Sequence, residues 1–229
     1  MIVAIHQPQF MPWLGYFDKM DRADVFVFLD NVQFKKNEWQ NRNRIKTAKG
    51  WQWLTVPVSY HFPELINRVR VNNNLNWQKK HLHALLTNYR KAPFFDLYFP
   101  HFKEFYKREW GRLADLNIES VILLKDILGI PTRTCIASQL GEMGDDPTGR
   151  LIGICKALGA DTYLAGKDGR NYMDLEAFEG AGLRVIFQDF HHPVYPQPFG
   201  GFEPCMSAID LVFNCGPGGL TIIRKENGR

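Results

Sequence analysis

Long apolar runs are missing from this sequence of 229 residues. A membrane-spanning helix needs about 18 or more consecutive apolar residues, and no segment approaches that length. The opening run, Met1–Ile5, is too short for the hydrophobic region of a signal peptide and has no basic segment before it. We therefore expect a cytoplasmic protein that does not insert directly into a membrane.

Cysteine is scarce, with four in the chain, and no two of them form a CxxC motif. They lie within apolar stretches, at Cys135, Cys155, Cys205 and Cys215. Buried reduced thiols are more common in that setting than disulfides or zinc ligands. The helical HxxxH pattern and the usual mixed sets of histidine, cysteine and aspartate are also missing. We expect no metal site, and the sequence indicates no particular cofactor.

Covalent catalysis is disfavoured, because the chain has no GxSxG nucleophile elbow and no cysteine in a recognisable nucleophile context. The formal net charge is +4, from 28 basic and 24 acidic residues. A charge of this size is compatible with a phosphorylated or nucleotide-linked ligand, but it is too small for a dedicated binder of duplex DNA. The charge alone does not decide between ligands.

The residues that are present predict alternating strands and helices. Residues 2–5 form a continuous apolar run, which is typical of a parallel strand buried on both faces. Pro12 suits the first turn of a helix. Further strands are expected at residues 24–30, 132–137, 162–165 and 183–187, and further helices at 148–158, 174–179 and 207–214. Such alternation predicts an α/β fold with a mostly parallel sheet and helices on both faces, in which residues 2–5 and 25–29 are neighbouring inner strands.

The middle of the chain is more polar and aromatic than the rest. Residues 51–58 suggest a hairpin introduced by Lys49-Gly50, and helices are expected within residues 82–89, 94–110 and 113–127. We interpret residues 60–115 as a helical, aromatic insertion that caps the sheet. The whole of residues 1–229 would then form a single α/β domain.

Polar side chains follow the predicted strands at their carboxyl ends, where open parallel sheets bind ligands. His6 and Gln7 follow the first strand, and Asp30 follows the second. An ordinary imidazole titrates near neutral pH, so His6 is a candidate general acid or base. A structural histidine that fixes the turn is an alternative of about equal weight.

A glycine-flanked basic loop follows the strand at residues 162–165. Its glycines would allow a close approach of the backbone to phosphate oxygens, and its cations would supply charge. The loop has neither the GxxxxGK[ST] nor the GxGxxG order, and a polar surface turn is an equally weighted alternative. The candidate ligand-binding residues are Gly166, Lys167, Asp168, Gly169, Arg170, Asn171 and Tyr172.

A second basic cluster, residues 41–44 with Lys35 and Lys36, follows the second predicted strand. Such a charge run is most often a solvated loop. Its position after a strand nevertheless suggests that it faces the same crevice as the glycine-flanked loop. The further candidates for substrate binding are Asn41, Arg42, Asn43 and Arg44, together with Trp13, Tyr16 and His192.

A series of sequence blocks is spread nearly from end to end of the chain: His6–Phe10 with Pro12–Phe17, Asp24–Asp30, Asn41–Ile45, Trp53–Val58, Tyr195–Gln197, and Ser207–Leu211 with Asn214. Through these blocks the chain resembles the WbqC-like family of bacterial proteins. Members of that family are typically encoded among genes for surface polysaccharide and nucleotide-sugar assembly. The resemblance implies a role in that process, but it supplies no established reaction and no catalytic residues.

The chain is more distantly similar to the nucleotidylyltransferase superfamily. Residues 12–16 would occupy the region of its HxGH element, and residues 167–172 loosely resemble its later basic loop. Trp13 and Tyr16 stand where that superfamily prefers His or Thr and His, so its phosphate-stabilising imidazoles would be missing. His6 would have to substitute for them, or the nucleotidyl chemistry would be lost.

The leading interpretation is a transferase that acts on a nucleotide-activated or phosphorylated sugar, at an amino group, during polysaccharide assembly. Lys167 and Arg170 would hold phosphate and Arg42 and Arg44 a second anionic group, while His6 with Asp30 would supply acid–base or orienting functions. The alternatives are a nucleotidylyltransferase-like enzyme and a noncatalytic nucleotide-sugar-binding or scaffold protein. The sequence leaves open the donor, the sugar and whether the protein forms a homo-oligomer.

Overall fold

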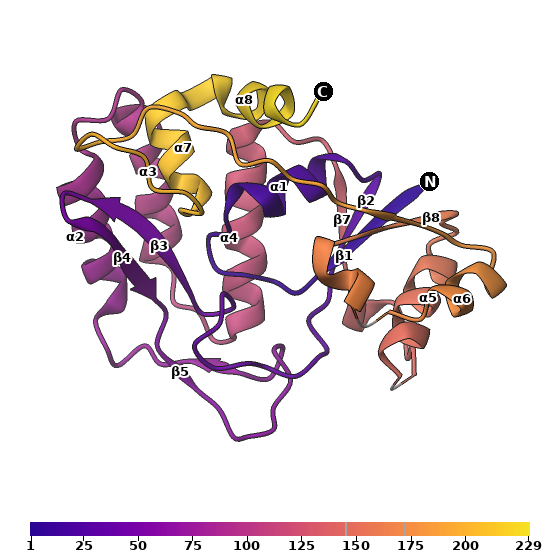
Figure 1. The fold of residues 1–229 in the computed structure, drawn as a ribbon. Helices are drawn as coiled ribbons and strands as arrows, with labels where there is room; N and C mark the ends of the chain where they lie inside the picture. The colour runs from indigo at the N-terminus through magenta and orange to yellow at the C-terminus, as the bar shows by residue number, and fades with distance from the viewer. Residues whose placement is uncertain (145, 172) are drawn as a thin grey trace.

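Five parallel strands form the central sheet in a computed structural model that describes residues 1–144, 146–171 and 173–229 (Figure 1). The strands are β1 (Ile2–His6), β2 (Val25–Phe28), β7 (Arg133–Ile136), β8 (Thr162–Ala165) and β9 (Arg184–Phe187). Their order across the sheet is β7-β2-β1-β8-β9, and every neighbouring pair is parallel. The predicted α/β fold is confirmed, with β1 and β2 as inner neighbours.

The side chains of the inner strands divide between two apolar cores, one on each face of the sheet. Ala4 of β1 packs in one core with Phe26 and Phe28 of β2. Val3 and Ile5 pack in the other. Successive side chains of a strand point to opposite faces, so an unbroken apolar run is stable only where both faces are covered. This burial explains why the opening residues form an inner strand.

Helices cover both faces of the sheet (Figure 1). Helices α1 (Leu14–Asp21) and α4 (Leu113–Leu128) contribute to the core that contains Ala4. Helix α5 (Pro147–Ala157) and helix α6 (Leu175–Gly180) contribute to the core that contains Val3. The arrangement follows the chain order, because each of these helices precedes the next strand of the parallel sheet.

The long connection between β2 and α4 forms a further layer, which lies on the left in Figure 1. It contains β3 (Arg42–Thr47), β4 (Gly50–Thr55), β5 (Val58–Ser59), β6 (Arg70–Val71), α2 (Trp77–Tyr89) and α3 (Phe95–Lys107). Apolar and aromatic side chains of α2 and α3 extend the core that contains Ala4. The insertion is helical and aromatic as predicted, but its regular structure starts before residue 60.

The hairpin differs from its prediction. The sequence predicted a hairpin over residues 51–58, with a loop at residues 41–44, whereas β3 pairs antiparallel with β4. The turn lies just before Gly50, whose φ of 100° favours glycine. Asn43 and Ile45 are buried on one side of β3 while its charged neighbours face the other way. The charged residues mask this alternation of side chains between the two faces, which is the sequence pattern that predicts a strand.

Two helices close the chain, α7 (Ala208–Cys215) and α8 (Gly219–Glu226), after an extended segment that leads from β9 across the molecule (Figure 1). Arg224 pairs with Asp21 at 2.7 Å, and Arg229 pairs with Asp18 at 2.6 Å, which fastens the C-terminus to α1. The four cysteines are free thiols. No helix within the described ranges combines the length and the apolarity of a membrane span.

Candidate functional site

A cavity of about 840 Å³ opens at the carboxyl ends of β1 and β8. These strands are neighbours in the sheet. Along the chain, β2 and β7 are added on one side of β1, and β8 and β9 are then added on the other side. Ligands of open α/β sheets bind where the strand order reverses in this way. We call this space the switch-point cavity, and it is lined by Ile5, His6, Gln7, Trp13, Lys19, Leu29, Val32, Gln33, Lys35, Pro147, Arg150, Leu151, Tyr163, Gly166, Lys167, Asp168, Gly169, Gln188 and Phe190.

Helix α4 holds the turn that leads from β1 into α1. Asn117 Nδ2 donates to the carbonyl oxygen of Pro8 at 3.0 Å, and Ser120 Oγ accepts from the backbone N–H of Met11 at 3.0 Å. Both side chains are fully buried, so they supply partners that the turn cannot take from water. Met11 adopts a φ of 43°, and α1 begins after it at Leu14 rather than at the predicted Pro12.

His6 stands at the end of β1 and lines the cavity. Its Nδ1 lies 3.1 Å from the carbonyl oxygen of Gln7. A carbonyl oxygen only accepts, so Nδ1 carries the proton and Nε2 is left as an acceptor. Burial, and then the nearby charge of Lys19, lower the pKa of His6 to about 3. The imidazole is therefore neutral at pH 7, and it is better suited to accept a hydrogen bond than to take up a proton.

Lys19 is a titratable residue of the cavity that sequence reasoning missed. Its side chain projects from α1 and is 3% exposed. Nζ donates to the carbonyl oxygen of Ile5 at 2.8 Å and lies 6.0 Å from the centre of the Tyr163 ring. Burial lowers the pKa of Lys19 to about 7. At neutral pH the amine and the ammonium forms are thus both populated, and the group can accept or release a proton.

Further cations reach the cavity from three separate segments. Lys35 comes from the connection after β2, Arg150 from α5, and Lys167 from the segment after β8. Among the described residues that line the cavity, Asp168 is the one that carries a carboxylate. The cations outnumber the carboxylate, and a low-dielectric cleft strengthens their combined field. The cavity is therefore suited to an anionic ligand such as a phosphate ester.

The glycine-flanked loop is a short 3-10 helix over Lys167–Asn171, and residues 166–169 line the cavity. A Cβ atom at Gly169 would lie 2.9 Å from Met173 Sδ and 3.3 Å from the Cβ of Ala165 at the end of β8, so this position is closely packed. Around a Cβ atom at Gly166, no heavy atom of the described residues lies within 4 Å, apart from those of Gly166 and its two chain neighbours. The close approach of phosphate oxygens to these glycines stays a prediction.

Trp13 forms an aromatic wall of the cavity and depends on the glycine beneath it. A Cβ atom at Gly15 would lie 2.5 Å from carbon atoms of the Trp13 indole. Phe190 meets the indole edge-on with ring centres 5.2 Å apart, and the His192 ring stacks on it at 6.4 Å. His192 Nε2 accepts from the backbone N–H of Cys205 at 3.1 Å. His192 is outside the described lining and contacts Trp13 through this stacking.

Gln7 and Tyr16 stabilise the same turn in different ways. Gln7 lines the cavity, and its Oε1 accepts from Gln40 Nε2 at 2.7 Å. Tyr16 is buried, with its hydroxyl donating to the carbonyl oxygen of Gln7 at 3.2 Å. Its hydroxyl therefore contacts the backbone of the turn.

Asp30 lies at the end of β2 but outside the described lining of the cavity. Its carboxylate accepts from the backbone N–H and the hydroxyl of Ser138, at 3.0 and 2.7 Å, and from Asn67 Nδ2 at 3.2 Å. The side chain is buried and joins three segments. These contacts stabilise the ends of β2 and β7, and a role in proton transfer stays a prediction.

The cluster at residues 41–44 lies on the hairpin rather than at the cavity. Asn41 Nδ2 donates to the carbonyl oxygen of Val56 at 3.0 Å, and Asn43 Nδ2 donates to that of Met11 at 2.9 Å. Arg42 and Arg44 of β3 lie against tryptophan rings. These residues come after β2 in the sequence, but the connection from β2 to β3 is long. They therefore do not lie at the carboxyl end of β2.

The loop after β8 is split in the same way. Lys167 lines the cavity, whereas the Arg170 guanidinium lies 4.6 Å from the centre of the Phe187 ring. Asn171 ends the 3-10 helix, and Tyr172 lies outside the described residues. The cavity thus brings together His6, Gln7, Trp13, Gly166, Lys167, Asp168 and Gly169, and its described lining does not include Asp30, Arg42, Arg44, Arg170 or Asn171.

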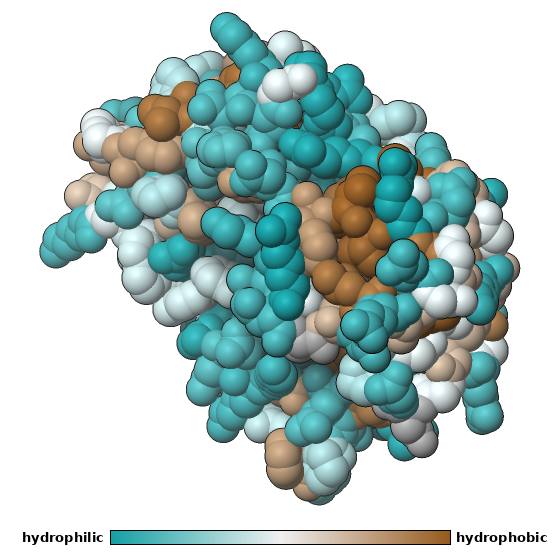
Figure 2. All heavy atoms as spheres, turned by 45° about the vertical axis from the view of Figure 1, so that its right-hand side comes forward, coloured by the Kyte–Doolittle hydropathy of each residue, from teal (hydrophilic) through white to brown (hydrophobic). Residues whose placement is uncertain are grey.

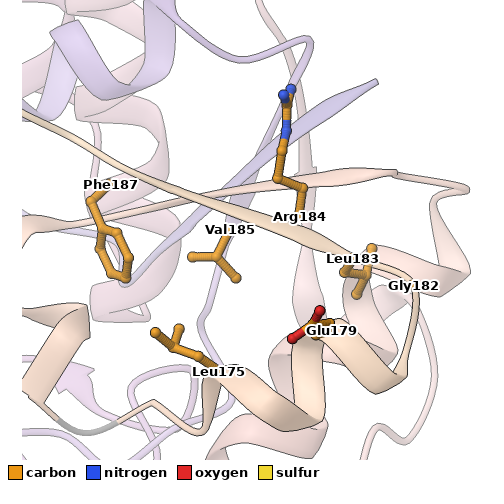
Figure 3. A pocket seen from close by; sticks show the side chains of 7 residues that line it. All are labelled: Leu175, Glu179, Gly182, Leu183, Arg184, Val185 and Phe187. Atoms are coloured by element: carbon orange, nitrogen blue, oxygen red, sulfur yellow. The ribbon is translucent and has the colours of Figure 1, made fainter.

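A second hollow, of about 500 Å³, lies between α6 and the edge strand β9 (Figure 3). The side chains of Leu175, Val185 and Phe187 extend toward it, while Arg184 points away on the other side of β9. Figure 2 turns this side of the molecule forward and shows apolar surface gathered in a hollow, with hydrophilic side chains around it. The apolar lining and the carboxylate of Glu179 do not match an anionic ligand. The switch-point cavity is therefore the candidate site.

A model of the WbqC-like protein family matches residues 7–222 of the chain. The chain belongs to this family. A protein of Mycobacterium tuberculosis (strain ATCC 25618 / H37Rv), "Uncharacterized protein Rv1507c", is 37% identical over 221 residues, which cover 93% of this chain and 94% of that protein. No solved structure matches the chain. The resemblance to the WbqC-like family is confirmed, and the more distant similarity to nucleotidylyltransferases stays a prediction.

Proposed function

We propose that this WbqC-like protein is a transferase that acts on a nucleotide-activated or phosphorylated amino sugar in bacterial surface polysaccharide biosynthesis. The observation that carries the proposal is the cationic switch-point cavity, in which Lys19, Lys35, Arg150 and Lys167 surround about 840 Å³. Sites for small molecules usually measure about 300–1,000 Å³. Cations at the carboxyl ends of parallel strands suit the oxygens of a phosphate or diphosphate.

Phosphate binding in this proposal uses two lysines that flank β1. Lys35 lies in the segment after β2, and Lys167 in the segment after β8, so the two come from either side of the central strand. Trp13 offers a flat apolar face to a sugar or base ring. Holding the substrate in place and stabilising charge would supply most of the rate enhancement.

Lys19 takes the proton in the transfer step that we propose. As the amino group of the sugar attacks the donor, a bond forms between its nitrogen and the transferred group, the bond between that group and the rest of the donor breaks, and the leaving group departs with that electron pair. The nitrogen must then lose a proton. Lys19, with a pKa of about 7, can receive it. His6, neutral and with a free lone pair on Nε2, accepts a hydrogen bond from the same amino group and orients it. His6 thus keeps an orienting role.

The nucleotidylyltransferase alternative has less support from the geometry. Tyr16, at one of the HxGH positions, has its hydroxyl on the carbonyl oxygen of Gln7, and Trp13, at the other, carries no charge. Neither supplies a phosphate-stabilising imidazole. Magnesium-dependent turnover of a nucleoside triphosphate would favour this alternative, and ligand binding without product for every donor would favour a noncatalytic binder.

A thermal-shift screen of nucleotide sugars, acyl donors and nucleoside triphosphates tests the proposal. A specific ligand at one hundred times its Kd stabilises a protein by about 2.7 kcal/mol. We expect one or more nucleotide sugars to raise the melting temperature of the wild type but not of a Lys35→Ala/Lys167→Ala variant. Lys79→Ala/Lys91→Ala removes two exposed lysines outside the cavity lining and is the matched control. A screen in which no nucleotide sugar stabilises the wild type would contradict the proposal.

A further inference from the structure

One face of the β3–β4 hairpin carries arginines between partly exposed tryptophans. Trp51 is 41% exposed and Trp53 is 36% exposed. The Arg42 guanidinium lies 4.2 Å from the centre of the Trp53 ring, and that of Arg44 lies 5.0 Å from Trp51 and 5.3 Å from Trp39. We call these five residues the tryptophan face. Exposed aromatic rings gathered in one place mark binding surfaces.

The positive charge of this face is not neutralised. Among the ion pairs of the described residues, none involves Arg42 or Arg44. Arg42 Nη2 donates to the carbonyl oxygen of Asn37, and Arg44 Nη2 donates to that of Cys205 at 3.4 Å. Carbonyl oxygens accept these hydrogen bonds without carrying a formal charge. The face therefore attracts an anion and offers flat rings beside it.

The loop over residues 33–40 joins the tryptophan face to the switch-point cavity. Lys35 lines the cavity, whereas the Trp39 ring packs 5.6 Å from that of Trp53. An extended chain spans at most about 14 Å over the four residues from Lys35 to Trp39. Gln40 also ties the loop to Gln7 of the cavity. A substrate that extends beyond the cavity would meet this face.

We propose that the tryptophan face is a second substrate subsite, which binds an acidic saccharide unit of the substrate that extends beyond the cavity. A sugar ring packs its C–H groups on Trp51 or Trp53, and its carboxylate or phosphate pairs with Arg42 or Arg44. The link to the cavity rests on the function proposed above. The subsite adds the requirement for an acidic group on the saccharide.

The tilt of the rings favours a saccharide over a single-stranded nucleic acid. The Trp39 and Trp53 planes meet at 53°, and the Trp51 and Trp53 planes at 77°. Successive bases on an aromatic platform stack parallel to the rings that hold them. Rings tilted to this extent do not offer such a series of parallel faces, whereas neighbouring sugar rings need not be parallel.

Binding to an array of bacterial surface glycans tests the subsite. We expect the wild type to retain acidic glycans and to bind neutral ones poorly. Arg44→Gln should weaken the binding of acidic glycans by about tenfold or more, because a hydrogen bond to a charged group is lost. Trp51→Ala/Trp53→Ala should also weaken it, because the rings that pack against the sugar are removed. Arg108→Gln is the matched control, because Arg108 also lies over a tryptophan, 4.3 Å from the centre of the Trp110 ring. Melting temperatures establish that each variant folds, and Arg44→Gln provides the test if the double tryptophan variant does not.

Failure of the subsite is distinguishable from failure of the proposed function. Acidic glycans bound equally by the wild type and Arg44→Gln, or no acidic glycan bound at all, would overturn the subsite. So would a preference for single-stranded oligonucleotides over every glycan. A wild type that binds acidic glycans but is not stabilised by any nucleotide sugar would contradict the proposed function and leave the subsite supported.

Discussion

The switch-point cavity and the tryptophan face hold their positive charge in two different ways. In the cavity, burial brings the pKa of Lys19 to about 7, so its charge changes near physiological pH. On the tryptophan face, Arg42 and Arg44 lie against aromatic rings, and a guanidinium does not lose its proton in proteins. The first region can move a proton, while the second can only attract and position. Chemistry is thus expected at the strand ends and recognition on the hairpin.

The largest effect is expected from Lys19→Met, which removes the proposed proton acceptor. Turnover should fall by about 10²- to 10⁴-fold, the usual contribution of general acid–base catalysis. Lys19→Arg should not restore it, because the guanidinium stays protonated. The measurement is kcat against pH, with the nucleotide sugar found by the screen. Wild-type turnover in Lys19→Arg would show that charge, not proton transfer, is what Lys19 provides.

A second prediction compares two basic residues of one loop. Lys167→Ala should weaken nucleotide-sugar binding by about 1.5–3 kcal/mol, the range for a hydrogen bond to a charged group. Arg170→Ala should change it by less than about 0.5 kcal/mol, because Arg170 lies over Phe187 instead of lining the cavity. Isothermal titration calorimetry measures both. Equal losses in the two variants would mean that the whole loop, not Lys167, contacts the ligand.

The glycine under Trp13 gives a third prediction. Gly15→Ala should lower the free energy of unfolding by about 1–3 kcal/mol, the usual cost of overpacking, because the new Cβ would collide with the indole. Gly166→Ala, which has open space around it, is the matched control within the cavity lining. Chemical denaturation gives the stability. Equal stability of the two variants would show that the indole of Trp13 moves aside without cost.

The last prediction concerns the free energy of unfolding as a function of pH. The pKa of Lys19 is about 7 in the folded protein, whereas that of an unburied lysine is 10.5. Between these two pH values the unfolded chain therefore binds more protons than the folded protein does. The free energy of unfolding should therefore rise with pH from about 7 to 10.5, by at most about 1.4 kcal/mol per pH unit from this group. The wild-type curve should show this rise relative to Lys19→Met, and Arg44→Gln should keep it. Parallel curves for the wild type and Lys19→Met would contradict the lowered pKa.

The sheet was predictable because each inner strand is buried on both faces and therefore leaves an unbroken apolar run. The strand at residues 162–165 was placed with its observed bounds. The β3–β4 hairpin was not predicted with its observed bounds, because one side of β3 carries Arg42 and Arg44, and a charged segment suggests a solvated loop. What makes this segment a strand is its pairing with β4, which a local pattern does not contain.

Lys19 could not be recognised from its own position, because a lysine in the last turn of a short helix is normally a surface residue. The available signal is that Lys19 stands in a stretch rich in apolar residues, next to Met20 and one turn after Tyr16. Its burial arises when α1 packs on β1 and Nζ reaches the carbonyl oxygen of Ile5. Such tertiary contacts decide the pKa, and the sequence does not display them.

The central claim is that the switch-point cavity binds a phosphate-bearing sugar, and a crystal structure of the protein with the nucleotide sugar that stabilises it most tests this directly. The account predicts phosphate oxygens within hydrogen-bonding distance of Lys167 and Lys35, and an amino group of the sugar beside Lys19 and His6. A nucleotide sugar bound instead in the hollow between α6 and β9, with the switch-point cavity empty, would contradict it.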